Sequence, residues 1–282
     1  MLCRIGDVEV WRILELHGPF MTPEELFPTA GPEVREIIRH HLPDGLCPAS
    51  GRLILPVQGF LLKTPSHLIL VDSCVGNDKT VPGHPDWHQR SDDRFMASLR
   101  AAGVGPADMD YVLCTHLHTD HVGWNTRLED GRWVPTFPNA RYLMPSADEE
   151  ALAERRSDTY IESVLPVIGA GQAELVTAGH MLGDYVTLLA TPGHTPGHVS
   201  VLIKSGTAEA VITGDALHTT VQCRHPEWHF KFDTDGDMAV TSRRRLLEDA
   251  SEANRTVLGS HFALPSIGRV RAQGDAFRWN ED

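Results

Sequence analysis

The stretch Thr115-His-Leu-His-Thr-Asp-His-Val-Gly-Trp-Asn125 places His116, His118, Asp120 and His121 within six residues. The segment directly before it, Met-Asp-Tyr-Val-Leu-Cys, has the character of a short apolar strand, so the cluster is expected where a strand ends. Residues two apart on an extended segment share a face, which lets His116 and His118 point at one ion. The following turn re-aims Asp120 and His121 toward a second ion. Imidazole nitrogens and carboxylate oxygens are zinc-type ligands, so the stretch predicts a metal centre.

Three later segments also present a histidine or aspartate just after a predicted strand. His194 lies between two Pro-Gly turns, which fix its loop before any metal binds. Asp215 ends the strand Val-Ile-Thr-Gly-Asp, and its two carboxylate oxygens can bridge two cations. His261 follows a short strand in the same way. His198 is a weaker candidate, with a structural or outer-contact role expected, because His194 directly follows the strand end.

Together these residues predict a centre for two ions. One ion takes His116, His118 and His194, the other takes Asp120, His121 and His261, and Asp215 bridges them. Two cations about 3.5–4 Å apart can share a hydroxide. Two further residues stay open in role. Asp72, which ends the apolar run Leu-Ile-Leu-Val-Asp, either caps the next turn or holds a ligand imidazole. His218, three residues after Asp215, either donates to the substrate oxygen or packs behind the site.

The rest of the chain alternates between strand and helix patterns, which predicts sheets covered by helices in a single domain, 1–282. Residues 17–50 form a Pro-rich insertion, expected as a lid or a dimer contact, with one helix at Pro32–Leu42. Strands are predicted at Val8–Leu16, Leu53–Val57, Gly59–Thr64, Leu68–Asp72, Arg141–Met144, Ala173–Thr177, Tyr185–Ala190, Val199–Lys204, Ala210–Thr213 and, as the last, Thr256–Leu258. Helices are predicted at Arg94–Ala102, Ala147–Ser157 (capped by Ser146), Tyr160–Ile168 and Asp237–Asn254.

The composition limits the possible partners. Acidic residues outnumber basic ones by 38 to 25, and a net charge of −13 disfavours binding to nucleic acid or anionic membranes. The basic run Arg243-Arg244-Arg245 is expected to face solvent from a helix. The five cysteines are scattered and lack paired spacing, no secretory signal is visible, and no apolar run of about 18 residues occurs. These features predict a cytoplasmic protein with reduced thiols.

The pattern His116-x-His118-x-Asp120-His121, followed by His194, Asp215 and His261, resembles the metallo-β-lactamase superfamily in its dinuclear hydrolase form. The resemblance extends from about Leu68 to His261. It implies an α+β fold, a four-layer αββα sandwich of two mixed β-sheets flanked by helices, with the metals at one edge.

Within the superfamily, the chain looks most similar to the branch of methyl parathion hydrolase and the N-acyl homoserine lactonases. The text around Asp215 and His261 and the Ser-Arg-Arg-Arg-Leu-Leu helix carry that similarity. This branch implies a metal-bound hydroxide that attacks the carbonyl of a lactone or carboxylic ester. Asp120 would orient the hydroxide, and His218 is the candidate donor to the substrate. The branch also implies two divalent ions, with Zn²⁺ expected and Mn, Fe or Co as alternatives, and often a homodimer.

Other activities on the same fold remain as alternatives. A phosphotriesterase-like activity on organophosphates is the next candidate. A glyoxalase II-type thioesterase is less favoured, because the motif reads Gly123-Trp124 and only about twenty residues follow His261. A β-lactamase is less favoured because those enzymes carry Cys or a smaller residue where Asp215 stands. A non-catalytic module is disfavoured because all seven ligand positions are filled.

Overall fold

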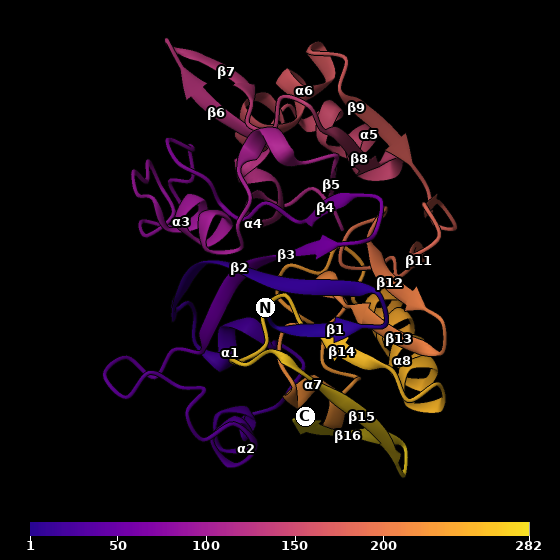
Figure 1. Cartoon of the computed structure of the whole chain (residues 1–282). Coiled ribbons are helices and arrows are strands. Elements are labelled where there is room, and N and C mark those ends of the chain that lie inside the picture. The colour runs from indigo at the N-terminus through magenta and orange to yellow at the C-terminus, as the bar shows by residue number, and fades with distance from the viewer. Residues whose placement is uncertain (282) are drawn as a thin grey trace. The chain divides into compact units, whose positions relative to one another are not determined.

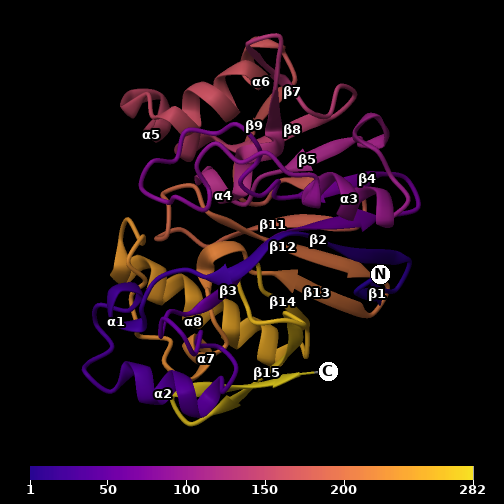
Figure 2. The same cartoon turned by 90° about the vertical axis from the view of Figure 1, so that its left-hand side faces the viewer.

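The structure is a computed structural model that describes residues 1–281, and residue 282, the end of the expected single domain, lies outside the described part. The chain divides into two compact units. The first unit holds Met1–Glu15 and Val57–Tyr185, and the second holds Leu16–Pro56 and the chain from Val186 onward. Figure 1 traces the whole chain from indigo to yellow, and Figure 2 gives a second view. Each unit is described below by itself.

The sheet of the first unit has parallel strands from its centre to one edge. In sheet order it contains β1 (Cys3–Ile5), β2 (Val8–Pro19), β3 (Ile54–Lys63), β4 (Leu68–Val71), β5 (Tyr111–Leu113), β8 (Arg141–Pro145) and β9 (Ala173–Val176), with β2 and β3 crossing the unit boundary. β3 and β4 are antiparallel, while β4, β5, β8 and β9 pair in parallel. Parallel strands end at one edge of a sheet, and Val71 pairs with Leu113. Asp72 and the motif that begins at Thr115 therefore start side by side.

The two strands expected at Leu53–Val57 and Gly59–Thr64 are one continuous strand, β3. Gly59 lies within this strand, where its backbone passes close to that of Asp72. A Cβ at this position would lie 2.2 Å from the carbonyl oxygen of Asp72, so only glycine lets the two backbones approach this closely.

Helices and a hairpin complete the first unit. They are α3 (Arg94–Ala101), η1 (Pro106–Asp108), α4 (Thr119–Val122), η2 (Gly123–Asn125), β6 (Thr126–Glu129), β7 (Arg132–Pro135), α5 (Ser146–Arg155), η3 (Tyr160–Val164) and α6 (Leu165–Gly169). The two-residue strand β10 (Met181–Leu182) falls within the same residues but is the edge strand of the other seven-stranded sheet. The hairpin β6–β7, seen in magenta in Figure 1, is absent from the sequence prediction. The prediction that Ser146 caps its helix is wrong, because α5 begins at Ser146 and Pro145 is the cap residue, without a side-chain hydrogen bond. The helix predicted at Tyr160–Ile168 is a π-turn followed by a short α-helix.

The second unit carries another mixed sheet. Its strands are β11 (Val186–Ala190), β12 (Val199–Ser205), β13 (Ala208–Ile212), β14 (Thr256–Leu258), β15 (Ile267–Gln273) and β16 (Ala276–Glu281), and its helices are α1 (Pro23–Leu26), α2 (Val34–His41), η4 (Gly214–Ala216), α7 (Val221–Arg224) and α8 (Gly236–Glu252). The prediction that β14 is the last strand is wrong, because β15 and β16 form a hairpin after it. β13 and β14 are parallel, and Ile212 pairs with Leu258. Asp215 and His261 each lie three positions beyond this pair, so the register brings them together.

The long helix α8 contradicts one expectation. Arg243, predicted to face solvent, has an exposed fraction of 0%. It lies on the same helix face as Ala239, Leu246, Leu247 and Ala250, which are all buried. The prediction that Arg243 faces solvent, which rested on its charge alone, is therefore wrong. The spacing of the apolar residues around it indicates the buried face of the helix.

Residues of the predicted 17–50 insertion supply part of the apolar core of the second unit. Phe27 of this insertion contacts Trp228 and Phe230, with ring centroids 5.5 and 5.7 Å apart. Whether the segment serves as a lid or a dimer contact stays a prediction. None of the five cysteines, all within residues 1–281, is joined in a disulfide. Among residues 1–281, no helix combines the length and the apolar character that a membrane crossing requires.

Candidate metal centre

The first group of candidate ligands, His116, His118, Asp120 and His121, gathers in the first unit as the sequence predicts. The ring centroid of His116 lies 4.6 Å from that of His118 and 4.1 Å from that of His121. Asp120 places a carboxylate oxygen 3.8 Å from His121 Nε2. Its side chain is 14% exposed, whereas that of His121 is 1% exposed, so Asp120 is the more accessible of the two to water.

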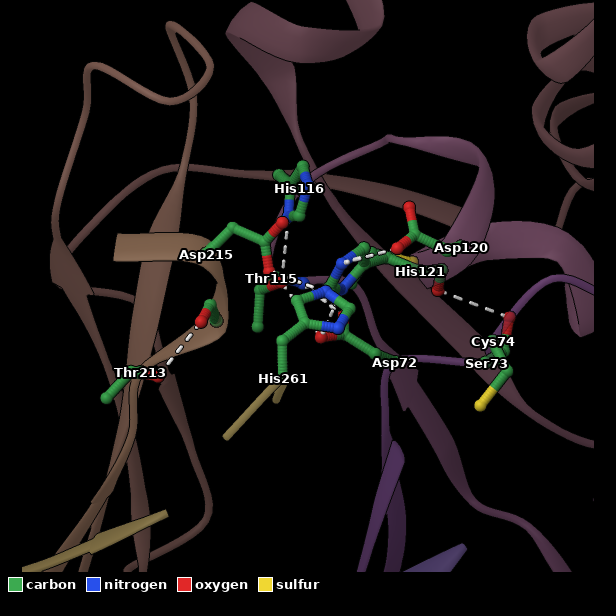
Figure 3. Close-up of polar contacts among 12 residues, drawn as sticks. Asp72, Ser73, Cys74, Thr115, His116, Asp120, His121, Thr213, Asp215 and His261 are labelled. Atoms are coloured by element: carbon green, nitrogen blue, oxygen red, sulfur yellow. Dashed lines mark hydrogen bonds and ion pairs between the residues drawn. The ribbon is translucent and has the colours of Figure 1, made fainter. Parts of the chain in front are cut away.

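Asp72 organises this group from behind. Its Oδ1 accepts a hydrogen bond from the Thr115 backbone N–H at 2.8 Å, and its Oδ2 lies 2.9 Å from both Thr115 Oγ1 and His121 Nδ1 (Figure 3). Of the two roles left open for Asp72, this contact with the His121 imidazole favours the second, in which it holds a candidate ligand in place. A single carboxylate therefore fixes the positions of both Thr115, where the motif starts, and His121.

Glu15, which the sequence analysis did not single out, supports the turn that follows the motif. This buried carboxylate accepts hydrogen bonds from Trp124 Nε1 at 2.7 Å, Val75 N at 2.8 Å and Gly76 N at 3.3 Å. Burial raises the pKa of Glu15 above its usual value, while the Trp124 and Val75 hydrogen bonds lower it. Glu15 therefore ties β2 to the loop after β4 and to η2, three residues beyond His121.

The second group of candidate ligands, His194, Asp215 and His261, gathers in the second unit. Asp215 Oδ2 lies 3.2 Å from His194 Nε2, and its Oδ1 lies 3.2 Å from His261 Nε2. All three residues are buried. The two oxygens of Asp215 thus face two different imidazoles, which is the arrangement that a bridging carboxylate requires.

His198 acts as a structural residue, as expected. Its Nε2 accepts a hydrogen bond from the Asp215 backbone N–H at 2.8 Å, and its Nδ1 lies 2.8 Å from Thr191 Oγ1. His198 therefore holds the backbone of Asp215 from the neighbouring strand and leaves the carboxylate to face the other imidazoles.

His218 lies against the same carboxylate. Its Nε2 is 3.1 Å from Asp215 Oδ2, and its ring stacks on Phe230 with centroids 3.4 Å apart. The Nδ1 atom of His218 is buried and makes no hydrogen bond within residues 1–281. Burial lowers the pKa of His218 to about 4, so the imidazole is neutral at pH 7.

Four of the five candidate imidazoles have an outer contact at Nδ1. This nitrogen lies 3.1 Å from Thr115 Oγ1 in His116, 2.9 Å from Asp72 in His121, 2.9 Å from Asp233 in His194 and 2.8 Å from the Pro56 carbonyl oxygen in His261. An outer partner at one ring nitrogen orients the ring and directs the other nitrogen, Nε2, toward a metal. The donor set and these contacts fit divalent cations with mixed N/O ligands.

Asp233 was also missed by the sequence analysis. It lies in the segment between α7 and α8, which contains no recognisable motif, 39 positions from its partner His194. Burial lowers the pKa of His194, but the carboxylates of Asp215 and Asp233 outweigh it and raise that pKa to about 9 in the absence of a metal. No spacing rule links Asp233 to the ligands, and only the folded chain reveals it.

Comparison with known proteins places the chain in a family. Residues 54–261 match the family model of the metallo-beta-lactamase superfamily. The chain is 31% identical over 221 residues to an N-acyl homoserine lactonase from a Bacillus species and 30% identical over 220 residues to one from Bacillus cereus. Each match covers 74% of this chain and 82% of the relative.

Solved structures agree with this match. AidC, described as a dizinc quorum-quenching lactonase in complex with a product, has a TM-score of 0.82 at 21% identity, covering 99% of this chain and 96% of AidC. The hydrolase AbOPH, described as a member of the beta lactamase superfamily, has the same TM-score at 24% identity, with the same coverage. The chain therefore belongs to the metallo-β-lactamase superfamily, and the α+β fold class expected from its sequence, with two mixed sheets and helices, is confirmed.

Proposed function

We propose that this protein is a metal-dependent hydrolase that opens a lactone ring, with two divalent cations held by the two ligand groups. The observation that carries the proposal is Asp215, whose two oxygens face His194 and His261 separately at 3.2 Å. The lactonase relatives named above, one of them 31% identical, support a lactone as the substrate.

The proposed ligand set is the one expected from the sequence. Each of the seven residues offers one imidazole nitrogen or carboxylate oxygen. One ion would be held by His116, His118 and His194 and the other by Asp120, His121 and His261, with Asp215 shared between them. Two cations in such a centre lower the pKa of water toward neutrality and polarise a carbonyl oxygen, which is the Lewis-acid chemistry that ester hydrolysis needs.

The chain's own residues would then do the orienting. Asp120, whose side chain is 14% exposed, accepts a hydrogen bond from the attacking water and aims it at the carbonyl carbon. His218 lies beside Asp215 and is neutral at pH 7. It would donate an N–H hydrogen bond to the substrate oxygen as that oxygen develops negative charge. Asp72 and His198 keep the ligands in place and do not touch the substrate.

The test is a hydrolysis panel run with purified protein before and after chelation. It contains N-acyl homoserine lactones of several chain lengths, simple lactones, aryl esters, a phosphotriester, a thioester and a β-lactam. We expect kcat/KM to be highest for a lactone, to vanish on chelation and to return with added Zn²⁺. A higher kcat/KM for the phosphotriester or the thioester would overturn the substrate assignment.

Substitution of the bridge tests the site itself. Asp215→Ala should reduce the metal content below two ions per chain and abolish hydrolysis. His218→Phe keeps a ring that can stack on Phe230, so it should retain metal while lowering kcat, because it removes only the donor nitrogen. Full activity and metal content in Asp215→Ala would remove the basis for the proposed centre.

Three finer assignments belong to the same proposal. We expect zinc as the native metal, a homodimer in which residues 17–50 serve as a lid or a subunit contact, and a cytoplasmic location. Metal analysis of protein purified without added metal, light scattering of the intact chain and of a chain with residues 17–50 altered, and cell fractionation test these in turn. Iron or manganese as the bound metal, a monomer, or a secreted product would each overturn the corresponding assignment.

A further inference from the structure

The loop that presents His194 is clamped to the segment before α8. The His194 carbonyl oxygen accepts a hydrogen bond from Thr234 N at 3.0 Å, and the Gly193 carbonyl oxygen accepts one from Asp235 N at 2.8 Å. A Cβ on Gly193 would lie 2.1 Å from Ala239 N, so the loop touches the first turn of the helix directly. The position of His194 therefore depends on a segment about 40 residues later in the chain.

Asp233 is the side chain through which this segment reaches the imidazole. Its Oδ1 lies 2.9 Å from His194 Nδ1, and both side chains are 1% exposed. Its Oδ2 accepts a hydrogen bond from the Phe230 backbone N–H at 2.8 Å and lies 3.6 Å from the Arg243 guanidinium. One backbone donor and one positive charge thus face the same oxygen, and the imidazole faces the other.

Arg243 fixes this arrangement from the helix. Its Nε donates to the Ala216 carbonyl oxygen at 2.8 Å, and its Nη1 donates to those of Trp228 at 2.7 Å and Pro226 at 2.9 Å. A fully buried guanidinium held by three carbonyl groups cannot follow a rotating carboxylate. Asp233 is therefore confined to one orientation, with Oδ2 toward the donors.

We propose that Asp233 is a positioning residue that fixes the tautomer of His194. By accepting a hydrogen bond from Nδ1–H, it keeps the proton on Nδ1 and leaves the lone pair of His194 on Nε2, the nitrogen that faces Asp215. The inference rests on the metal centre proposed above, in which His194 is a ligand. Metal-ligating histidines commonly donate their second ring N–H to a carboxylate that does not itself bind the metal, and Asp233 would be that carboxylate for His194.

Asp233→Asn is the decisive variant because it keeps the size and shape of the side chain. The asparagine must turn its carbonyl oxygen toward the Phe230 N–H donor and the positive charge of Arg243. Its NH₂ group then faces His194 Nδ1 and donates to it, so the proton moves to Nε2 and the ligand lone pair is lost. An amide in place of a carboxylate selects the wrong histidine tautomer by the same logic in serine proteases.

The matched control is Asp235→Asn in the same segment. Asp235 caps α8 by accepting from Met238 N at 2.9 Å, and asparagine caps helices equally well. It makes the same chemical change two residues away without facing His194 through its side chain. Both variants and the wild type are compared as full chains by metal content, by metal release to a chelator and by circular dichroism.

We expect Asp233→Asn to keep the circular dichroism spectrum of the wild type, to bind fewer than two metal ions and to release metal about 10–100-fold more readily. The Co²⁺-loaded variant should also show an altered visible absorption spectrum, because one nitrogen ligand has changed. Asp235→Asn should match the wild type in every measurement. Asp233→Asn with wild-type metal content, release rate and Co²⁺ spectrum would overturn the inference.

A measurement on the wild type covers the case in which the variant does not fold. In ¹⁵N-histidine-labelled protein loaded with Zn²⁺, the His194 ring, assigned by its loss in His194→Gln, should carry its proton on Nδ1. A proton on Nε2 would overturn the inference. If the wild type binds no metal, the proposed function fails first, so the two failures are distinguishable.

Discussion

Lys79→Met probes a buried charge in the first unit whose energetic effect depends on pH. The side chain of Lys79 is 2% exposed. Its Nζ donates to Thr126 Oγ1 at 2.6 Å and to the Glu162 carbonyl oxygen at 3.2 Å, and it lies 3.5 Å from the centroid of the Trp133 ring. Burial lowers the pKa of this ammonium group to about 7, against the pull of Glu162 and Asp78.

The sign and size of the pH effect on the free energy of unfolding follow from proton linkage. Below pH of about 7, Lys79 is protonated in both the folded and the unfolded chain, so the full penalty of burying the charge is present. Between about pH 7 and pH 10 the unfolded chain binds more protons, so stability from this group rises by up to about 1.4 kcal/mol per pH unit. Methionine has no such dependence. The free energy of unfolding of the wild type relative to Lys79→Met should therefore rise by about 2 kcal/mol between about pH 7.5 and about pH 9.

Urea unfolding followed by circular dichroism measures this difference at each pH, and comparing variants at equal metal content cancels effects of metal binding. Lys204→Met is the control, because the Lys204 side chain is 59% exposed and pairs with Glu209 at the surface. A difference between wild type and Lys79→Met that stays constant with pH would refute the reasoning. So would an equal rise in the control.

Three further substitutions test the supports of the metal centre. Asp72→Asn should increase metal release about 10–100-fold with little change in circular dichroism, since one acceptor oxygen that holds Thr115 or His121 is lost, and unchanged release in a chelator competition would contradict this. Glu15→Gln should lower the free energy of unfolding by about 1–3 kcal/mol, because its NH₂ must face a buried N–H donor, and an unchanged urea midpoint would contradict it. Gly193→Ala should both destabilise the chain and release metal, because the new Cβ would lie 2.1 Å from a backbone nitrogen of α8 and φ is +130°. A Gly193→Ala protein with wild-type stability and metal content would show that the loop and the helix separate easily.

Most of the regular structure was predictable because the strands carry local patterns. β14 was predicted at its observed bounds, and the helix predicted at Asp237–Asn254 differs from α8 by a few residues at its ends. The hairpins β6–β7 and β15–β16 were missed. Both contain several charged or polar residues, such as Arg-Val-Arg-Ala-Gln in β15, so their apolar alternation is weak. Their pairing depends on partner strands rather than on their own composition.

Buried polar residues were the hardest to predict. Arg243 was expected in solvent because of its charge, yet three carbonyl groups and Asp233 surround it. Glu15 gave no signal within an alternating strand, although it accepts three hydrogen bonds from residues at least 60 positions away. A sequence shows that such a group exists, but only its partners make burial tolerable, and the partners come from other elements.

The sequence by itself determined which residues of this protein are candidate metal ligands. His116, His118, Asp120 and His121 share one short motif, and His194, Asp215 and His261 each follow a strand, so residue type and local position were sufficient. Tertiary structure alone decided which residues hold those ligands: Asp72 behind His121 and Asp233 behind His194. The physical reason is that residue types and strand ends can be recognised from short stretches of sequence. A hydrogen bond at an outer ring nitrogen instead requires a register between distant segments, and that register exists only once the sheets and α8 have packed.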